Sequence, residues 1–305
     1  MKQHNLALGS LRLNVLTALM LMMGVGMLSS CDDDGLSGGD PDYFTSSRGQ
    51  FTATLDDGTT LFLIPGSTAN TATVTYDGSN PQHWQGKDNA TVDIETYTGD
   101  FVLYETVTAD DGKTYRLTSI GDEAFMGNRS LTTLTLPESI QSFGEAAFAV
   151  CTKLTAVNIP EGITEIPLGC FGHCTSLSEV ILPSTVKTLG KMAYYGCSKI
   201  TSVALPEGLE SIGEMAFFDC SSSGLTQITI PSTVNHIGKL AFGGRDGNSR
   251  SKISDYYIKS SIPPTLDGEL YQTGEGVEPI IHVPSGTGDA YRNAPGWSSL
   301  NIMEE

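Results

Sequence analysis

The chain has 305 residues and a formal net charge of −18, with 39% hydrophobic and 17% charged residues. This composition favours a folded core, because disordered chains combine low hydrophobicity with dense charge. Basic residues are not clustered anywhere in the sequence, which argues against nucleic acid and anionic lipid headgroups as partners. The acidic excess by itself indicates only a soluble, self-repelling surface.

Residues 1–30 have the features of a targeting segment. Lys2 and Arg12 supply a basic start, and residues 15–28 form an apolar run that is too short to cross a bilayer of ~30 Å as a helix. The run leads into Leu-Ser-Ser-Cys, which resembles a bacterial lipobox. The resemblance implies a lipoprotein signal peptide, cleavage before Cys31 and lipid attachment to its thiol. An ordinary signal peptide, or a cytoplasmic protein with an unstructured start, is the alternative.

Residues 31–48 are predicted to form a flexible acidic tether, since they are rich in Gly, Ser and Asp and have no apolar period. Asp32, Asp33 and Asp34 follow the cysteine directly, and such a charge run is normally a solvated linker. The run also resembles the acidic export signal of some Gram-negative lipoproteins. That resemblance implies a lipid-anchored protein of the outer membrane, exposed at the cell surface. The periplasmic face is the alternative.

Residues 49–116 are predicted to form a β-rich N-terminal cap. Short β-type runs at 51–55, 60–64 and 71–76 end in Asp-Gly or Pro-Gly dipeptides. Asp-Gly between alternating apolar runs is a strong hairpin signal. We expect this cap to cover the first edge of a repeat sheet, which would otherwise present unpaired backbone groups.

Residues 117–262 contain a repeat of about 23 residues. An aromatic residue returns in every repeat, at Phe125, Phe148, Phe171, Tyr194, Phe217 and Phe242. A short apolar alternation such as LTTLTLP closes each repeat with a proline, which ends a strand because it lacks the ladder donor. Before each strand, Gly opens a segment whose apolar positions have helical spacing, which predicts a short helix or helical turn.

Strand–turn–helix units that repeat in one direction predict an α/β solenoid. One face should be a parallel β-sheet, and the other should carry the short helical turns. The aromatic column then forms the buried structural core of the coil rather than a stacking platform for a ligand.

Residues 263–305 are predicted to form a C-terminal cap. Within it, 280–284 has the pattern of a last strand and 289–294 that of a helical turn. Tyr291 and Trp297 are expected to cover the apolar end of the coil.

The recurring pattern I-G-x-x-A-F-x-x-C-x-x-L-x-x-V-x-I-P closely resembles the BspA-like leucine-rich repeat family of bacterial surface proteins. The pattern matches best at 120–137, 143–160, 189–206 and 212–231. The resemblance implies a leucine-rich-repeat-like right-handed coil. It also implies binding of a partner rather than catalysis, without naming that partner.

Cys151, Cys174, Cys197 and Cys220 also recur with the repeat. Ligands in one straight column cannot surround a tetrahedral zinc ion. Parallel side chains ~4.8 Å apart also exceed the usual Cβ–Cβ separation of a disulfide, ~3.5–4.5 Å. We therefore expect buried apolar fillers. Cys170 and Cys174, four residues apart, are the best disulfide candidate.

The sequence predicts no catalytic residues, no metal site and no cofactor. Its five histidines are scattered without metal-ligand spacing, and no nucleophile, phosphate or dinucleotide motif has a suitable context. The carboxylates include no pair that the sequence identifies as acid and base. An enzyme is therefore not expected.

The exposed face of the sheet is the predicted binding surface. Strand alternation points mostly small polar side chains outward. The candidates for partner binding are Thr133, Thr135, Asn158, Glu179, Ile181, Ser202, Gln227, Thr229 and Tyr257. A more anchor-like alternative combines Tyr257 with Tyr271 and the loop 243–252.

Together these features predict a non-catalytic, surface-exposed lipoprotein that binds a protein or glycan partner through its solenoid, in adhesion or in contact with host or matrix proteins. The alternative is a structural or glycan-binding accessory of a surface nutrient-capture assembly.

Overall fold

The computed structural model describes five stretches of the chain, residues 49–76, 97–220, 224–244, 252–272 and 278–305. Apart from Gly49 and Gln50, these residues belong to one compact unit. The predicted signal peptide, the acidic tether and Cys31 lie outside the described residues. Over the described stretches, no helix is both long and apolar enough to cross a membrane.

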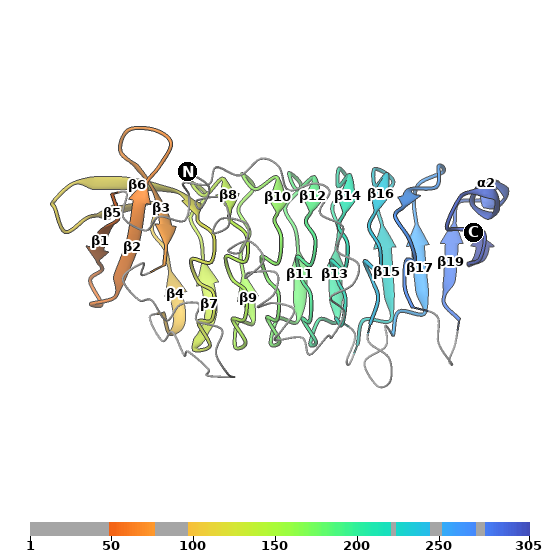
Figure 1. Cartoon of the computed structure of the whole chain (residues 1–305), viewed down its shortest axis with the longest axis horizontal. Helices are drawn as coiled ribbons and strands as arrows, with labels where there is room; N and C mark the ends of the chain where they lie inside the picture. The colour runs from red at the N-terminus through yellow and green to blue at the C-terminus, as the bar shows by residue number, and fades with distance from the viewer. Residues whose placement is uncertain (1–48, 77–96, 221–223, 245–251, 273–277) are drawn as a thin grey trace, which may run out of the picture. The chain divides into compact units, whose positions relative to one another are not determined.

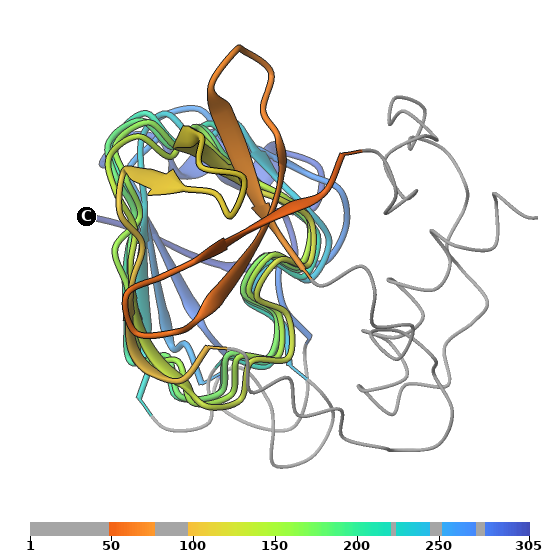
Figure 2. The same ribbon diagram turned by 90° about the vertical axis from the view of Figure 1, so that its left-hand side faces the viewer.

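The unit is a solenoid of parallel strands, and Figure 2 shows the coils of the repeat region lying over one another. Each coil places one strand in what we call the exposed ladder, whose strands follow in chain order in Figure 1. These strands are β4 (Gly99–Val102), β7 (Leu131–Thr135), β9 (Ala156–Val157), β11 (Glu179–Ile181), β13 (Ser202–Ala204), β15 (Gln227–Ile230), β17 (Asp255–Ile258), β19 (Ile280–Val283) and β20 (Asn301–Glu304). They pair in parallel within three runs, β4-β7-β9, β11-β13 and β15-β17-β19-β20.

A second parallel ladder, which the sequence analysis did not predict, runs along the coils. It contains β8 (Ser142–Phe143), β10 (Glu165–Ile166), β12 (Thr188–Leu189), β14 (Ser211–Ile212), β16 (His236–Ile237) and β18 (Thr265–Leu266). Strands β10 to β18 pair in this order, and β8 pairs with β6 (Thr114–Ile120) of the N-terminal sheet. Two-residue strands are too short to show an alternating pattern, so the sequence carries no period-2 signal for them.

The helical turns predicted opposite the sheet, and with them the α/β class, are not confirmed, because the described repeats consist of strands and turns. The segment with helical spacing in each coil is a run of successive turns. Ala146 and Val150, for example, have φ values of 52° and 62°, in the left-handed region that a right-handed helix excludes. Alternate N–H groups also bond to the next coil, as Phe148 N does to the Cys170 carbonyl oxygen at 2.9 Å.

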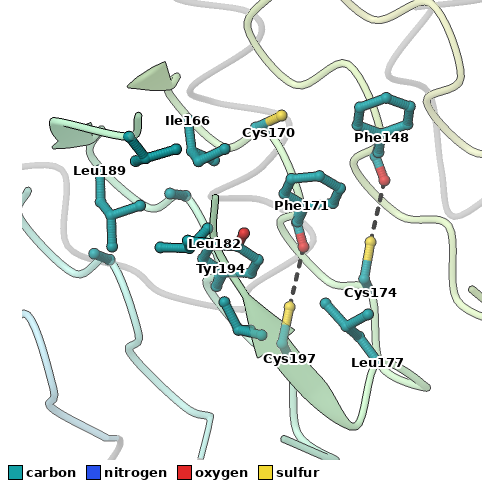
Figure 3. Close-up of a cluster of buried hydrophobic side chains, with 14 of the residues drawn as sticks. Phe148, Ile166, Cys170, Phe171, Cys174, Leu177, Leu182, Leu189, Tyr194 and Cys197 are labelled. Carbon is teal, nitrogen blue, oxygen red and sulfur yellow. Dashed lines mark hydrogen bonds between the residues drawn. The ribbon is translucent and has the colours of Figure 1, made fainter. Parts of the chain in front are cut away.

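The aromatic column forms a continuous stack inside the coil. All six rings are at most 2% exposed, and neighbouring ring centroids lie between 5.0 Å (Phe148–Phe171) and 5.7 Å (Phe217–Phe242) apart. Figure 3 shows part of this core, in which Leu177, Leu182 and Leu189 lie near the stack. The buried aromatic area accounts for much of the hydrophobic stabilisation of the repeats.

The N-terminal sheet joins the solenoid at its first coils. It contains β1 (Phe51–Thr54), β2 (Thr60–Pro65), β3 (Thr71–Thr75), β5 (Thr106–Thr108) and β6 (Thr114–Ile120), in the order β1-β2-β3-β6-β5. The runs predicted at 51–55, 60–64 and 71–76 thus form strands. Strand β4, from the same predicted cap, pairs with β7 and is the first strand of the exposed ladder.

At the other end, the predicted helical turn corresponds to α2 (Gly288–Asn293), and the predicted last strand corresponds to β19. Tyr291 and Trp297 are both fully buried, with ring centroids 5.1 Å apart. Each donates to a backbone carbonyl: Tyr291 Oη to Ser260 at 2.8 Å and Trp297 Nε1 to Pro264 at 2.7 Å. The sequence analysis missed β20, which adds one more strand beyond β19.

Candidate binding surface

The exposed ladder displays two rows of outward side chains. Strand register aligns Val102 with Thr135, Ile181 with Ala204, and Thr229 with Tyr257. We call this line the Ile181 row, and it continues through Asn158, His282 and Met303. The Glu179 row lies two residues earlier in each strand and contains Asp100, Thr133, Ala156, Glu179, Ser202, Gln227 and Asp255.

All nine candidate residues of the sequence analysis lie in these two rows. Ile181 is the most prominent among them, with 68% of its surface exposed, whereas Thr133 and Tyr257 are partly buried. The alternative site built on Tyr257 and Tyr271 is not formed, because Tyr271 is 3% exposed and stacks on buried Tyr256 at 5.6 Å. Most of the loop in that alternative, 245–251, lies outside the described residues.

Two of the candidates have polar groups that already bond within the protein. The side-chain amide of Asn158 accepts from Leu136 N at 2.7 Å and donates to the Leu136 carbonyl oxygen at 2.8 Å, in place of a ladder partner. The Thr133 hydroxyl donates to Asp100 Oδ1 at 2.7 Å. This bond, with a second from Thr132, holds the pKa of Asp100 below its usual value, so the carboxylate stays ionised.

Three exposed apolar residues on or beside the ladder were not predicted. Val102 and Met303 belong to the Ile181 row and are 43% and 45% exposed, and Tyr104 follows β4 with 65% exposed. The alternation that begins at Phe101 contained the signal for Val102. Met303 had no such signal, because β20 lacks an alternating apolar pattern.

The C-terminal end of the two rows holds a compact cluster around His282. Its Nε2 lies 2.9 Å from Asp255 Oδ1, its Nδ1 lies 2.9 Å from Glu305 Oε1, and its ring stacks on Tyr257 with centroids 4.4 Å apart. Hydrogen bonds from Ser254 and then His282 lower the pKa of Asp255. The Ser254 hydroxyl faces Asp255 rather than His282, so the cluster lacks the nucleophile–base contact of acyl transfer.

A column of carboxylates follows the strand-ending prolines, and the next coil fixes its members in place. We define the carboxylate column as Glu138, Glu161 and Glu207. Glu161 Oε2 accepts from the Ser184 hydroxyl at 3.0 Å, and Glu207 Oε2 accepts from Ser232 at 3.0 Å. The Pro-Glu dipeptides at 137–138, 160–161 and 206–207 were the sequence signal for this column, and the sequence analysis did not use it.

Basic side chains lie at the opposite end of the strands. Lys153 and Lys199 are both exposed. Each lies two residues before a threonine, Thr155 or Thr201, that directly precedes strand β9 or β13. The exposed ladder is therefore electrostatically asymmetric, with carboxylates after the strands and lysines before them. Among the described residues, no group of three or more His, Cys, Asp or Glu side chains is arranged so that it could hold a metal ion.

A stack of parallel-strand coils of about 23 residues, with a buried aromatic core, defines a leucine-rich repeat protein. Residues 118–248 match the BspA type leucine rich repeat region in six copies, and the repeats of this chain belong to that family. None of the curated protein sequences matches the chain.

Solved structures of bacterial leucine-rich repeat proteins are similar to this chain. The leucine-rich repeat protein TpLRR of T. pallidum is similar with a TM-score of 0.50 and 20% identity, over 80% of this chain and 94% of that one. A leucine-rich cell surface protein of Faecalibacterium prausnitzii A2-165 gives a TM-score of 0.46 and 20% identity, over 82% and 76% of the two chains. At this identity the T. pallidum structure supports the solenoid fold alone.

Proposed function

We propose that this protein is a non-catalytic, lipid-anchored surface protein that binds a macromolecular partner through its exposed ladder. One observation carries the proposal. Positions that repeat from coil to coil are buried, whereas the exposed positions differ, as at Glu179 and Ser202 or at Ile181 and Ala204. A rigid repeat scaffold with a variable exposed surface is the usual architecture of a binding solenoid.

The chemistry of the described residues also favours binding over catalysis. Cys151, Cys170, Cys174 and Cys197 are buried, and desolvation raises their pKa values, so they are poor nucleophiles. Both ring nitrogens of His282 lie 2.9 Å from carboxylate oxygens rather than beside a hydroxyl or thiol that the ring could activate as a general base.

Attachment to the outer membrane through Cys31, with exposure at the cell surface, completes the proposal. Its support is the sequence alone: the lipobox-like tetrapeptide and the acidic run after it. Labelled fatty acid should be incorporated into the wild-type chain and not into Cys31→Ala. Proteases added to intact cells should release the wild-type protein. If Cys31→Ala is still labelled and still displayed on cells, the anchor is elsewhere.

Arrays of matrix proteins and of glycans, probed with the full chain, test the binding function. We expect a ligand whose capture is lost in the double variant Glu179→Ala/Ile181→Ala and retained in Glu165→Ala, a matched change on the second ladder. A ligand captured equally by all three proteins would place binding away from the exposed ladder. Selective capture of glycans would favour the accessory of a nutrient-capture assembly over an adhesin.

A further inference from the structure

We infer that the partner is an extended basic protein segment with apolar side chains, and that it lies along the Ile181 row between Val102 and Ala204. This inference rests on the proposed function and specifies the partner of the same surface. It combines three observations: the apolar side chains of the row, the carboxylates on both of its sides, and the spacing of the coils.

The Ile181 row concentrates the exposed apolar side chains of the described protein. Over all the described residues, five large hydrophobic side chains are exposed: Val102, Tyr104, Ile181, Ile262 and Met303. Three of these five lie in this single row, which is more than scattered surface residues would give. Between Val102 and Ile181 the row holds only Thr135 and Asn158, and the small Ala204 follows Ile181. The two aliphatic side chains therefore stand above smaller neighbours.

Carboxylates lie on both sides of this part of the row. Asp100 and Glu179 belong to the neighbouring Glu179 row, and the carboxylate column, Glu138, Glu161 and Glu207, lies on the other side. All five are exposed. Hydrogen bonds from the next coil hold the side chains of Glu161 and Glu207 in place. These two side chains therefore lose less conformational entropy when they contact a cation.

The positions of the lysines favour this strip over the rest of the ladder. Lys153 and Lys199 lie before the strands, on the far side of the Glu179 row. Lys259 lies at the C-terminal end, with its Nζ 5.7 Å from the centre of the Tyr257 ring. The lysines thus repel a basic segment from the strand starts and from the end of β17, whereas the carboxylates attract it to the part of the row around Ile181.

The coil spacing fits an extended chain. Val102 and Ile181 are three strands apart in the row, about 14 Å at ~4.8 Å per strand. An extended chain rises ~3.4 Å per residue, so residues four apart lie at about the same distance. Because the side chains of an extended chain alternate between its two faces, a partner with apolar residues at positions i and i+4 and Lys or Arg at i+2 directs all three toward the strip.

The test uses the full chain in detergent micelles and a fluorescent peptide of repeating Val-Ser-Lys-Ser units, with binding measured by anisotropy. We expect Glu161→Gln/Glu179→Gln and, separately, Ile181→Thr each to raise Kd about tenfold, which is ~1.4 kcal/mol. The matched control Glu165→Gln/Glu269→Gln removes the same charge from exposed residues outside the ladder and should change Kd less than about twofold. Unchanged thermal unfolding checks that each variant is folded.

Two further peptides separate charge from shape. Repeating Val-Ser-Glu-Ser should not bind, and repeating Ser-Ser-Lys-Ser should bind about tenfold more weakly than the Val-containing peptide. The inference is overturned if the control Glu165→Gln/Glu269→Gln raises Kd as much as Glu161→Gln/Glu179→Gln does. It is also overturned if the basic peptide binds equally well with serine in place of valine. Either result would show nonspecific attraction to an acidic protein. If the arrays find a ladder-dependent ligand that is acidic or uncharged, the proposed function stands and this inference is wrong. If they find no ladder-dependent ligand, the proposed function itself is wrong.

Discussion

The thiol of Cys174 donates a hydrogen bond to the backbone carbonyl oxygen of Phe148 at 3.2 Å (Figure 3). The same contact recurs in the other coils, from Cys151, Cys197 and Cys220 to the carbonyl 26 residues earlier, at 2.9–3.1 Å. All these cysteines are buried and free. The cysteine column is therefore more than apolar filler, because each thiol supplies a donor to a buried carbonyl of the preceding coil.

This contact predicts a difference between two neighbouring cysteines. Cys174→Ala removes both packing and a donor to the Phe148 carbonyl, and should lower the free energy of unfolding by about 2 kcal/mol. Cys170→Ala should cost less than about 1 kcal/mol, because other coils carry alanine at this position and the Cys170 thiol has no hydrogen bond of this kind. Urea unfolding of both variants measures the difference. Equal losses would mean that the thiol contributes by volume alone.

The buried thiols also predict a pH dependence. Burial raises the pKa of Cys151 to about 12, from an ordinary value of 9.0. The folded state therefore holds this proton more tightly than the unfolded state, and the resulting stability is complete below pH 9.0 and decreases as the pH rises toward 12. Melting temperatures measured from pH 8 to 11 should fall less steeply for Cys151→Ala than for the wild type. Parallel curves would show that the thiol does not control this loss.

Native thiols should correspondingly resist alkylation. Cys151, Cys170 and Cys174 are inaccessible, with pKa values raised by desolvation, and the thiolate is the reactive form. Iodoacetamide at pH 8 should label the described cysteines only after urea unfolds the repeats, as mass spectrometry of the peptides would show. Rapid labelling of Cys174 in the native protein would indicate that the coil opens locally without unfolding.

Tyr194 stands in a column where the other coils carry phenylalanine, and its buried hydroxyl has no hydrogen-bond partner in the structure. Tyr194→Phe removes this unsatisfied group while keeping the ring stacked between Phe171 and Phe217. We expect the free energy of unfolding to rise by about 1 kcal/mol. Phe171→Tyr, which adds a hydroxyl to the same stack, should lower it. A destabilised Tyr194→Phe would reveal a partner for the hydroxyl.

The sequence was sufficient to predict the parts of the fold that depend on periodic burial. The aromatic stack and the strands before each proline follow from apolar positions that recur at a fixed interval, as at Phe148 and Phe171. The turns could not be distinguished from helices, because apolar spacing is the same for both. Only the left-handed φ values of residues such as Ala146 and Val150 distinguish these turns from a helix. Neither residue is a glycine, the residue type that would have indicated a left-handed backbone in the sequence.

The binding surface was predictable only in part. Alternation places Glu179 and Ile181 outward, and the structure agrees on their exposure. The contact between Tyr257 and His282 depends on register between β17 and β19, whose spacing departs from the regular repeat, so no sequence pattern connects the two residues. The internal role of Asn158 was equally invisible, since an outward polar residue in a strand normally faces solvent.

Asn158 provides the last prediction. Its amide bonds to both backbone groups of Leu136, and it therefore replaces a ladder pair between two coils. Asn158→Ala leaves the Leu136 groups without this partner, and should lower the free energy of unfolding by about 1–2 kcal/mol, with faster amide exchange at Leu136. Thr135→Ala, at an exposed position of the same row, should change stability by less than about 0.5 kcal/mol. If the two variants are equally stable and amide exchange at Leu136 is unchanged, the Asn158 amide does not replace a ladder pair and is free to contact a partner.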